Sequence, residues 1–162
     1  MPTRVLKAVQ DYYPDDFSHC FGCGRLNAPG HHVRTGWDGD ETVAYFAPEP
    51  HQIAVPGFVY GGLIASLIDC HGMGTAAAAA ERAAGRDIGD APSPRFVTAA
   101  LNVTFLKPTP LGPTLEIRAR AREVRARKVV VDATVIADGV VTVRAEVVAV
   151  RMPDAMRREQ KS

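Results

Sequence analysis

The stretch VYGGLIASLIDCHGMGTAAAAAERAAG, residues 59–85, decides the fold that we expect for this chain. Residues 61–84 are apolar nearly all round, and Gly85 is well placed to end a helix. The stretch is rich in alanine, a weak membrane residue, and it contains Asp69 and His71. We therefore expect a helix covered by the rest of the protein on most sides, rather than a membrane span.

The residues around this helix are typical of strands. Residues 42–47 form a short strand candidate before it, and residues 48–56 a loop. After it, residues 96–106 form a long strand candidate that ends at the rigid connector 107–113. Two further segments complete the pattern: residues 114–123, where apolar and charged residues alternate, and a hairpin of residues 129–137 and 140–150 around the Asp138-Gly139 turn.

These elements indicate a single domain of the α+β class. One strand, one long helix and about four antiparallel strands suit a curved sheet wrapped around the helix, and a second sheet edge or subunit could complete the coverage. Within the 162 residues we expect an irregular N-terminal segment (1–41) packed on the domain, the domain itself (42–152) and a frayed charged tail (153–162).

The composition narrows the partners and the compartment. A formal net charge of +1 gives no reason to expect nucleic acid or an acidic membrane as partner. Three cysteines do not make a disulfide framework and suit a reducing compartment. Residues 1–16 lack the apolar core of a secretory signal, so we expect a cytoplasmic protein.

The helix itself carries a candidate chemical site. Gly61 and Gly62 open it, leaving unpaired backbone N–H groups that can donate hydrogen bonds to a carbonyl oxygen or an oxyanion. Asp69 lies in the same helix among apolar residues, where an ionised carboxylate is costly unless it is paired or hydrated. At 1.5 Å per residue, Gly61 and Asp69 are roughly 12 Å apart. If they cooperate on one carbonyl group, they must come from two antiparallel copies of the helix, which requires a dimer.

The pattern Tyr60-Gly61-Gly62 followed by Asp69 resembles the His-Gly-Gly…Asp/Glu element of the hotdog thioesterases, in particular the phenylacetyl-CoA and 4-hydroxybenzoyl-CoA types. Other features resemble the same group in order and spacing over roughly residues 19–150. They are Cys20-Phe21-Gly22-Cys23-Gly24, Asn27-Ala28-Pro29-Gly30, His51-Gln52, Val97-Thr98, Asn102-Val103-Thr104-Phe105 and Lys107-Pro108.

The resemblance implies a hotdog fold whose sheets join across a homodimer, or within a homotetramer, with active sites at the interface. It implies hydrolysis of acyl-CoA thioesters without a metal or a redox cofactor, coenzyme A being part of the substrate. The roles that it implies are Gly61 and Gly62 as donors to the thioester carbonyl, Asp69 as nucleophile or general base, Thr98 as a holder of the attacking water, and His51, Gln52 and Tyr60 as residues on the substrate. Tyr60 stands where the family usually has histidine.

Other functions stay open. The main alternative is a hotdog dimer that binds an acyl-CoA or another hydrophobic ligand without turning it over. The reason to consider it is Tyr60, which replaces the usual histidine of the family. A hydratase would pair Asp69 with a histidine a few residues on, and His71 is too close for that. Cys20 and Cys23, with His19, His31 or His32, could hold zinc, although no familiar spacing is present and a loop packed by thiols is the preferred interpretation.

Three further features have simple structural interpretations. We expect His71 to be a packed or interface histidine and Cys70 to be a core residue. A run of basic residues is typical of a solvated strand face: Arg118, Arg120, Arg122, Arg125, Arg127 and Lys128. They could also meet the phosphates of coenzyme A.

Overall fold

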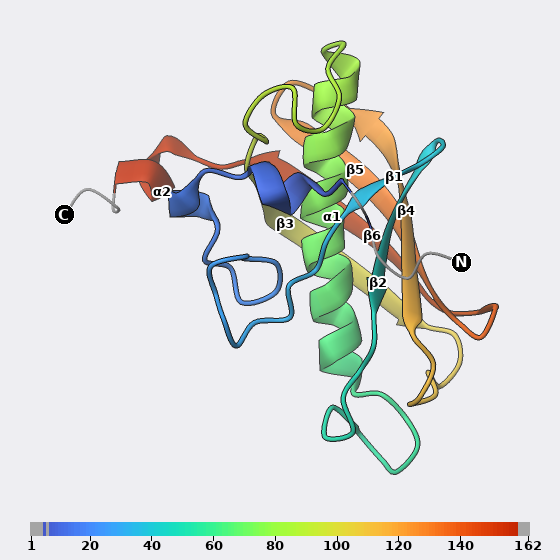
Figure 1. The fold of residues 1–162 in the computed structure, drawn as a ribbon. Coiled ribbons are helices and arrows are strands. Elements are labelled where there is room, and N and C mark those ends of the chain that lie inside the picture. The colour runs from blue at the N-terminus through green and yellow to red at the C-terminus, as the bar shows by residue number, and fades with distance from the viewer. Residues whose placement is uncertain (1–4, 6, 159–162) are drawn as a thin grey trace.

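The computed structural model describes residue 5 and residues 7–158. A long central helix lies against one curved antiparallel sheet, with the N-terminal segment on the other side of the helix (Figure 1). The elements in chain order are η1 (Val9–Tyr12) and η2 (Asp15–Phe17), which are short 3-10 helices, then β1 (Gly36–Asp38), β2 (Glu41–Phe46), α1 (Gly61–Ala83), β3 (Phe96–Phe105), β4 (Leu115–Val124), β5 (Lys128–Ala137), β6 (Val140–Arg151) and α2 (Asp154–Arg158).

The six strands form one sheet in the order β1-β2-β4-β5-β6-β3, with every neighbouring pair antiparallel. β3 is therefore an edge strand, and all but three of its ten residues are exposed. In β4 the alternation predicted from the sequence holds: Leu115, Ile117 and Ala119 are buried against α1, and the residues between them face outward. This is the hotdog arrangement that the resemblance implied.

Burial of α1 explains why its sequence is apolar on every face. The helix contacts β1 to β6 and also η1, and 78% of its most apolar window is buried inside the protein. Its length and composition would allow it to cross a membrane, but its burial is that of a core helix. It ends as predicted, because Gly85 takes a φ of +77° and lets Arg86 N–H donate to Glu81 O at 2.9 Å.

The structure differs from the sequence-based expectation at both ends of the chain. Segment 1–41, expected to be irregular, contains β1, which extends the sheet beyond β2, and the two 3-10 helices. Three residues of strand are too few to show an alternating pattern in the sequence. In the tail, expected to fray from residue 153, Met152 is buried and α2 continues to Arg158. Residues 159–162 lie outside the described part of the chain.

A polar cluster sits inside this apolar core. His71 is fully buried, with hydrogen bonds between Nδ1 and Thr35 Oγ1 (2.9 Å) and between Nε2 and Thr42 Oγ1 (3.2 Å). Thr42 in turn shares a 2.7 Å hydrogen bond with Thr75. The expectation of a packed histidine is confirmed. Desolvation by burial lowers the pKa of His71 from 6.5 to about 3.

This burial predicts a pH-dependent stability. Between about pH 6.5 and pH 3 the unfolded chain binds a proton at His71 that the folded chain does not, so the stability is present above pH 6.5 and is lost as the pH falls. We expect His71 to lower the free energy of unfolding by about 1 kcal/mol per pH unit in this range. Urea unfolding at pH 7.5, 5.5 and 4.5 measures it. The matched variant His71→Gln keeps a polar side chain but cannot titrate, so the stability gap between the two proteins should shrink as the pH falls. A constant gap would contradict the prediction.

Candidate active site

Asp69 lies two turns into α1, half-buried, on a face of the helix that the chain covers incompletely. Thr98, on the edge strand β3, donates a hydrogen bond from Oγ1 to Asp69 Oδ1. The two residues are 29 positions apart in sequence, and packing of β3 beside α1 brings them together. The hydroxyl group thus holds the orientation of the carboxylate group.

The start of α1 offers unpaired donors. The first bond of the helical ladder runs from Ile64 N–H to Tyr60 O at 3.3 Å, so the N–H groups of Gly61 and Gly62 precede it. Tyr60 is the N-cap residue, and its side chain makes no capping hydrogen bond. A Cβ atom at Gly61 would lie 3.4 Å from the ring of Phe105, so the side of the helix start that faces β3 is already lined by an aromatic group.

Tyr60 has a second effect on this end of the helix. Its ring folds over Gly62, since a Cβ atom at Gly62 would lie 2.5 Å from the ring carbons. The side chain is nevertheless 56% exposed. The phenol that replaces the family histidine therefore stands directly at the glycine pair, where a ligand would approach.

His51 and Gln52 lie in the loop that precedes α1. The Gln52 carbonyl accepts a 3.1 Å hydrogen bond from Tyr60 N–H, and the Gln52 side chain accepts one of 2.8 Å from Glu49 N–H. His51 Nδ1 lies 3.4 Å from a carboxylate oxygen of Glu49. Both side chains are turned toward Glu49, so within one chain this loop supports the helix start and does not reach Asp69.

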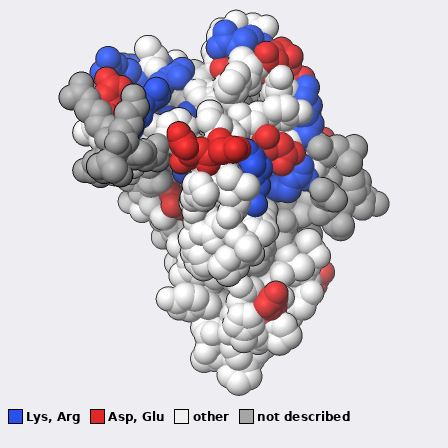
Figure 2. Space-filling model, turned by 60° about the vertical axis from the view of Figure 1, so that its left-hand side comes forward, with Lys and Arg blue, Asp and Glu red and all other residues white. Residues whose placement is uncertain are grey.

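An apolar groove of about 530 Å³ opens beside the start of α1. In the view of Figure 2, the end of the molecule at which α1 begins carries few charged side chains. Most of the charged side chains on this face gather at the opposite end. The groove is lined by Ala54, Val55, Phe58, Val59, Gly61, Ile64, Phe105, Leu106, Lys107, Pro108 and Thr109. A hydrophobic group could enter here next to the unpaired N–H groups.

The site residues predicted from the sequence thus fall into two groups within one chain. Asp69 and Thr98 form one group, while Gly61, Gly62, Tyr60, His51 and Gln52 gather at the helix start. Because α1 is continuous from Gly61 to Ala83, the separation of roughly 12 Å between Gly61 and Asp69 holds. One chain cannot apply both groups to one carbonyl carbon.

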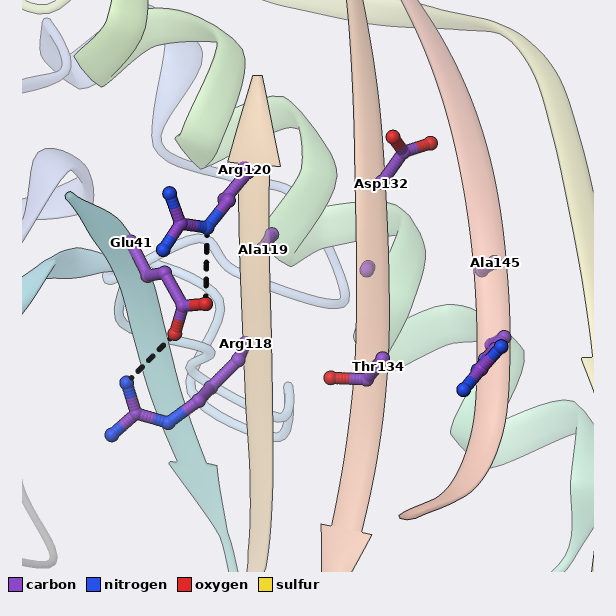
Figure 3. A pocket seen from close by; sticks show the side chains of 9 residues that line it. Glu41, Arg118, Ala119, Arg120, Asp132, Thr134 and Ala145 are labelled. Carbon is purple, nitrogen blue, oxygen red and sulfur yellow. Dashed lines mark hydrogen bonds and ion pairs between the residues drawn. The ribbon is translucent and has the colours of Figure 1, made fainter. Parts of the chain in front are cut away.

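The basic residues of β4 are neutralised by carboxylates on the outer face of the sheet. Glu41 on β2 accepts hydrogen bonds of 3.1 Å from both Arg118 and Arg120 (Figure 3). Arg122 pairs with Asp132 at 2.9 Å and also with Glu146. These arginines form a solvated strand face, which was one of the two interpretations of the sequence, and they lie across the sheet from α1. Their pairing with carboxylates was not predicted.

A cluster of thiols is the feature that sequence analysis missed. Cys70, assigned to the core, is buried but lies beside Cys20 and Cys23, and the three Sγ atoms are within 4.8 Å of one another. Hydrogen bonds with Cys23 and Cys70 lower the pKa of Cys20. The contacts of Cys70 with the other two thiols raise its pKa, and the contact with Cys20, together with burial, raises the pKa of Cys23 to about 12. The available signal was the presence of three cysteines in the chain, but Cys20 and Cys70 are 50 positions apart in the sequence, which concealed their contact.

Comparison with known proteins agrees with this architecture. Residues 56–144 match the sequence profile of the thioesterase superfamily. The chain is 34% identical to acyl-coenzyme A thioesterase THEM4 of Mus musculus over 94 residues, which are 58% of this chain. The match spans only 35% of the length of that relative.

Among solved structures, the chain is similar to a thioesterase superfamily protein of Shewanella loihica PV-4, with 46% sequence identity and a TM-score of 0.66. The similarity covers 87% of this chain and 100% of that chain. The PaaI protein of the E. coli phenylacetic acid degradation operon shares the fold at 16% identity, with 78% of this chain and 84% of that chain covered and a TM-score of 0.60. Since the superfamily profile covers more than half of its residues, the chain belongs to the thioesterase superfamily.

Proposed function

We propose that this protein hydrolyses acyl-CoA thioesters in active sites shared between two protomers. The observation that carries the proposal is the Asp69 carboxylate, held by Thr98 on an incompletely covered face of the central helix of a thioesterase-superfamily protein. Coenzyme A as the carrier is supported by a relative of the same fold, a Streptococcus mutans protein solved with acetyl CoA, at 19% identity, with 74% of this chain and 88% of that chain covered and a TM-score of 0.57.

The surface around Asp69 supports a partner subunit. Four residues of α1 form an incompletely covered stripe, and on the neighbouring edge strand β3 two large apolar side chains are exposed, Leu101 by 36% and Phe105 by 51%. An exposed edge strand with apolar side chains is a ready site for pairing with a second chain. The stripe consists of Gly62, Ala65, Ser66 and Asp69.

In such a dimer each active site would combine the helix start of one protomer with the carboxylate of the other. The thioester carbonyl oxygen would accept hydrogen bonds from Gly61 and Gly62 N–H, which stabilise the negative charge that develops on that oxygen. Asp69 of the partner would attack the carbonyl carbon or take a proton from water, with Thr98 orienting it. The acyl group would occupy the apolar groove, with the loop of His51 and Gln52 at its side. We expect no metal or redox cofactor in this chemical step.

Removal of the Asp69 charge tests the proposal directly. We expect Asp69→Asn to lower thiol release from acyl-CoA substrates by about 10²-fold or more, because the amide can neither attack nor accept a proton. The assay uses a panel of aliphatic and aromatic acyl-CoA thioesters. Asp138→Asn makes the same chemical change at the exposed turn between β5 and β6, where a φ of 49° suits asparagine, and should leave turnover unchanged. Equal turnover in Asp69→Asn and the wild type would exclude Asp69 from catalysis.

The Thr98 hydroxyl has a separate, smaller effect. Thr98→Val keeps the side-chain shape but removes the hydrogen bond to Asp69. A hydrogen bond to a charged group contributes about 1.5 kcal/mol, so we expect turnover to fall about 10-fold. The urea midpoint should change little, because Thr98 is exposed. Turnover equal to that of the wild type would show that the hydroxyl does not position the carboxylate.

The shared site predicts that activity depends on dimer formation. Leu101→Lys should make the protein monomeric in light scattering and reduce turnover in proportion, because a lysine at the strand edge opposes an apolar contact. Val124→Lys is the matched control: Val124 is an apolar strand residue of similar exposure (40%) on β4, away from β3. A fully active Leu101→Lys monomer would overturn the shared site.

A second candidate function follows from the place of Tyr60. Its ring lies over Gly62, so a dimer that binds acyl-CoA without hydrolysis is the alternative. Calorimetric binding of acyl-CoA without thiol release would favour it, and Tyr60→His should then gain turnover.

A further inference from the structure

The cluster of three thiols joins two separate parts of the chain, and it has no role in the proposed reaction. Cys20 and Cys23 come from the loop between η2 and β1, and Cys70 comes from α1. The Sγ atoms of Cys20 and Cys70 are 3.7 Å apart, and all three Sγ atoms lie within 4.8 Å of one another. Two sulfur ligands on one tetrahedral zinc ion, each at about 2.3 Å, are about 3.8 Å apart, which matches the closest pair.

The loop is shaped to present its thiols to the helix. Gly24 N–H donates to Cys20 O at 2.7 Å and closes a tight turn around Cys20 to Cys23. A Cβ atom at Gly22 would lie 2.2 Å from Cys70 Sγ, and one at Gly24 would lie 2.5 Å from the backbone nitrogen of Cys20. Larger residues at either position would push the loop away from α1, so the glycines maintain the approach of the thiols.

Two buried polar groups next to the cluster lack a partner among the described residues. They are the hydroxyl group of Tyr13 and the Nη1 atom of Arg95, whose guanidinium group lies 5.0 Å from the centre of the Tyr13 ring. Thiolates at Cys20 and Cys23 would raise the pKa of Arg95, so negative charge on the cluster favours this cation. Buried polar groups nearly always have a hydrogen-bond partner, and a partly buried cation such as Arg95 is stabilised by a nearby negative charge.

We propose that Cys20, Cys23 and Cys70 bind one thiophilic metal ion, Zn(II), as three thiolates, with a water molecule as the fourth ligand near Tyr13. The charges then balance: three thiolates oppose the two charges of zinc and the one of Arg95. A disulfide would consume two of the thiols and leave Arg95 facing neutral sulfur. The metal would tie the N-terminal segment to α1 at the residue after Asp69, and so would position the carboxylate without taking part in the reaction.

The test starts from the full chain, purified without chelator and with its thiols reduced. Mass spectrometry of the metals should find about one zinc per chain, and Co(II) added to the metal-free protein should show thiolate-to-cobalt absorption bands. Since loss of an outer-shell partner already weakens metal binding up to about 100-fold, Cys23→Ser and Cys70→Ser should each weaken zinc binding by more than that. Phe21→Leu is the matched control. It changes an exposed residue of the same loop and should keep the wild-type affinity.

A second readout avoids variants that do not fold. Alkylation of the wild-type protein, followed by mass spectrometry, should show all three cysteines protected when zinc is added and reactive when it is removed. The proposal is overturned if zinc protects none of them, if zinc binds Cys70→Ser as tightly as it binds the wild type, or if protein isolated in parallel without reductant holds a disulfide and no metal. These outcomes are independent of thioester turnover.

Discussion

The burial of α1 is the constraint on which the rest of the structure depends. A 23-residue helix with apolar residues on every face is stable in water only when other elements remove most of that surface from solvent. The sheet covers one side, and the N-terminal segment covers much of the other. Polar side chains inside this cover need internal partners, which Thr35 and Thr42 provide for His71. The same straight helix holds Gly61 and Asp69 roughly 12 Å apart, so a function that uses both requires a second copy.

Two surfaces are left incompletely covered, and they lie side by side. The stripe that includes Ala65 and Asp69 faces the same side as the exposed edge strand β3, where Thr98 reaches the carboxylate. The hydrogen bond between Thr98 and Asp69 contributes little to stability, because Thr98 is exposed to water. Its value is orientation. The apolar groove at the helix start is proposed to receive the acyl group. The paired arginines lie on the outer face of the sheet, so charge is concentrated away from this groove.

Two of the contacts between the N-terminal segment and α1 differ in kind. Around His71 the contact is a satisfied hydrogen-bond network in which each hydroxyl group has a partner. Around Cys70 the contact brings three thiols together near the buried hydroxyl group of Tyr13 and the Nη1 atom of the partly buried Arg95, both of which lack a hydrogen-bond partner among the described residues. Packing and hydrogen bonding account fully for the contact around His71. Packing alone does not account for the polar groups around Cys70, and the metal proposal is based on this contact for that reason.

The long helix, its end at Gly85 and the strand pattern after it could be predicted from the sequence, because each rests on local periodicity and turn chemistry. The alternation of Leu115 and Ile117 with charged neighbours even indicated which face is buried. Asp69 could be singled out because a carboxylate in an apolar helix is costly. Only the tertiary structure decided that Thr98 contacts Asp69, that the Tyr60 ring covers Gly62, and that Cys70 meets Cys20 and Cys23. These contacts join residues through the packing of separate elements or through a side-chain rotamer, and the local pattern of a sequence encodes neither.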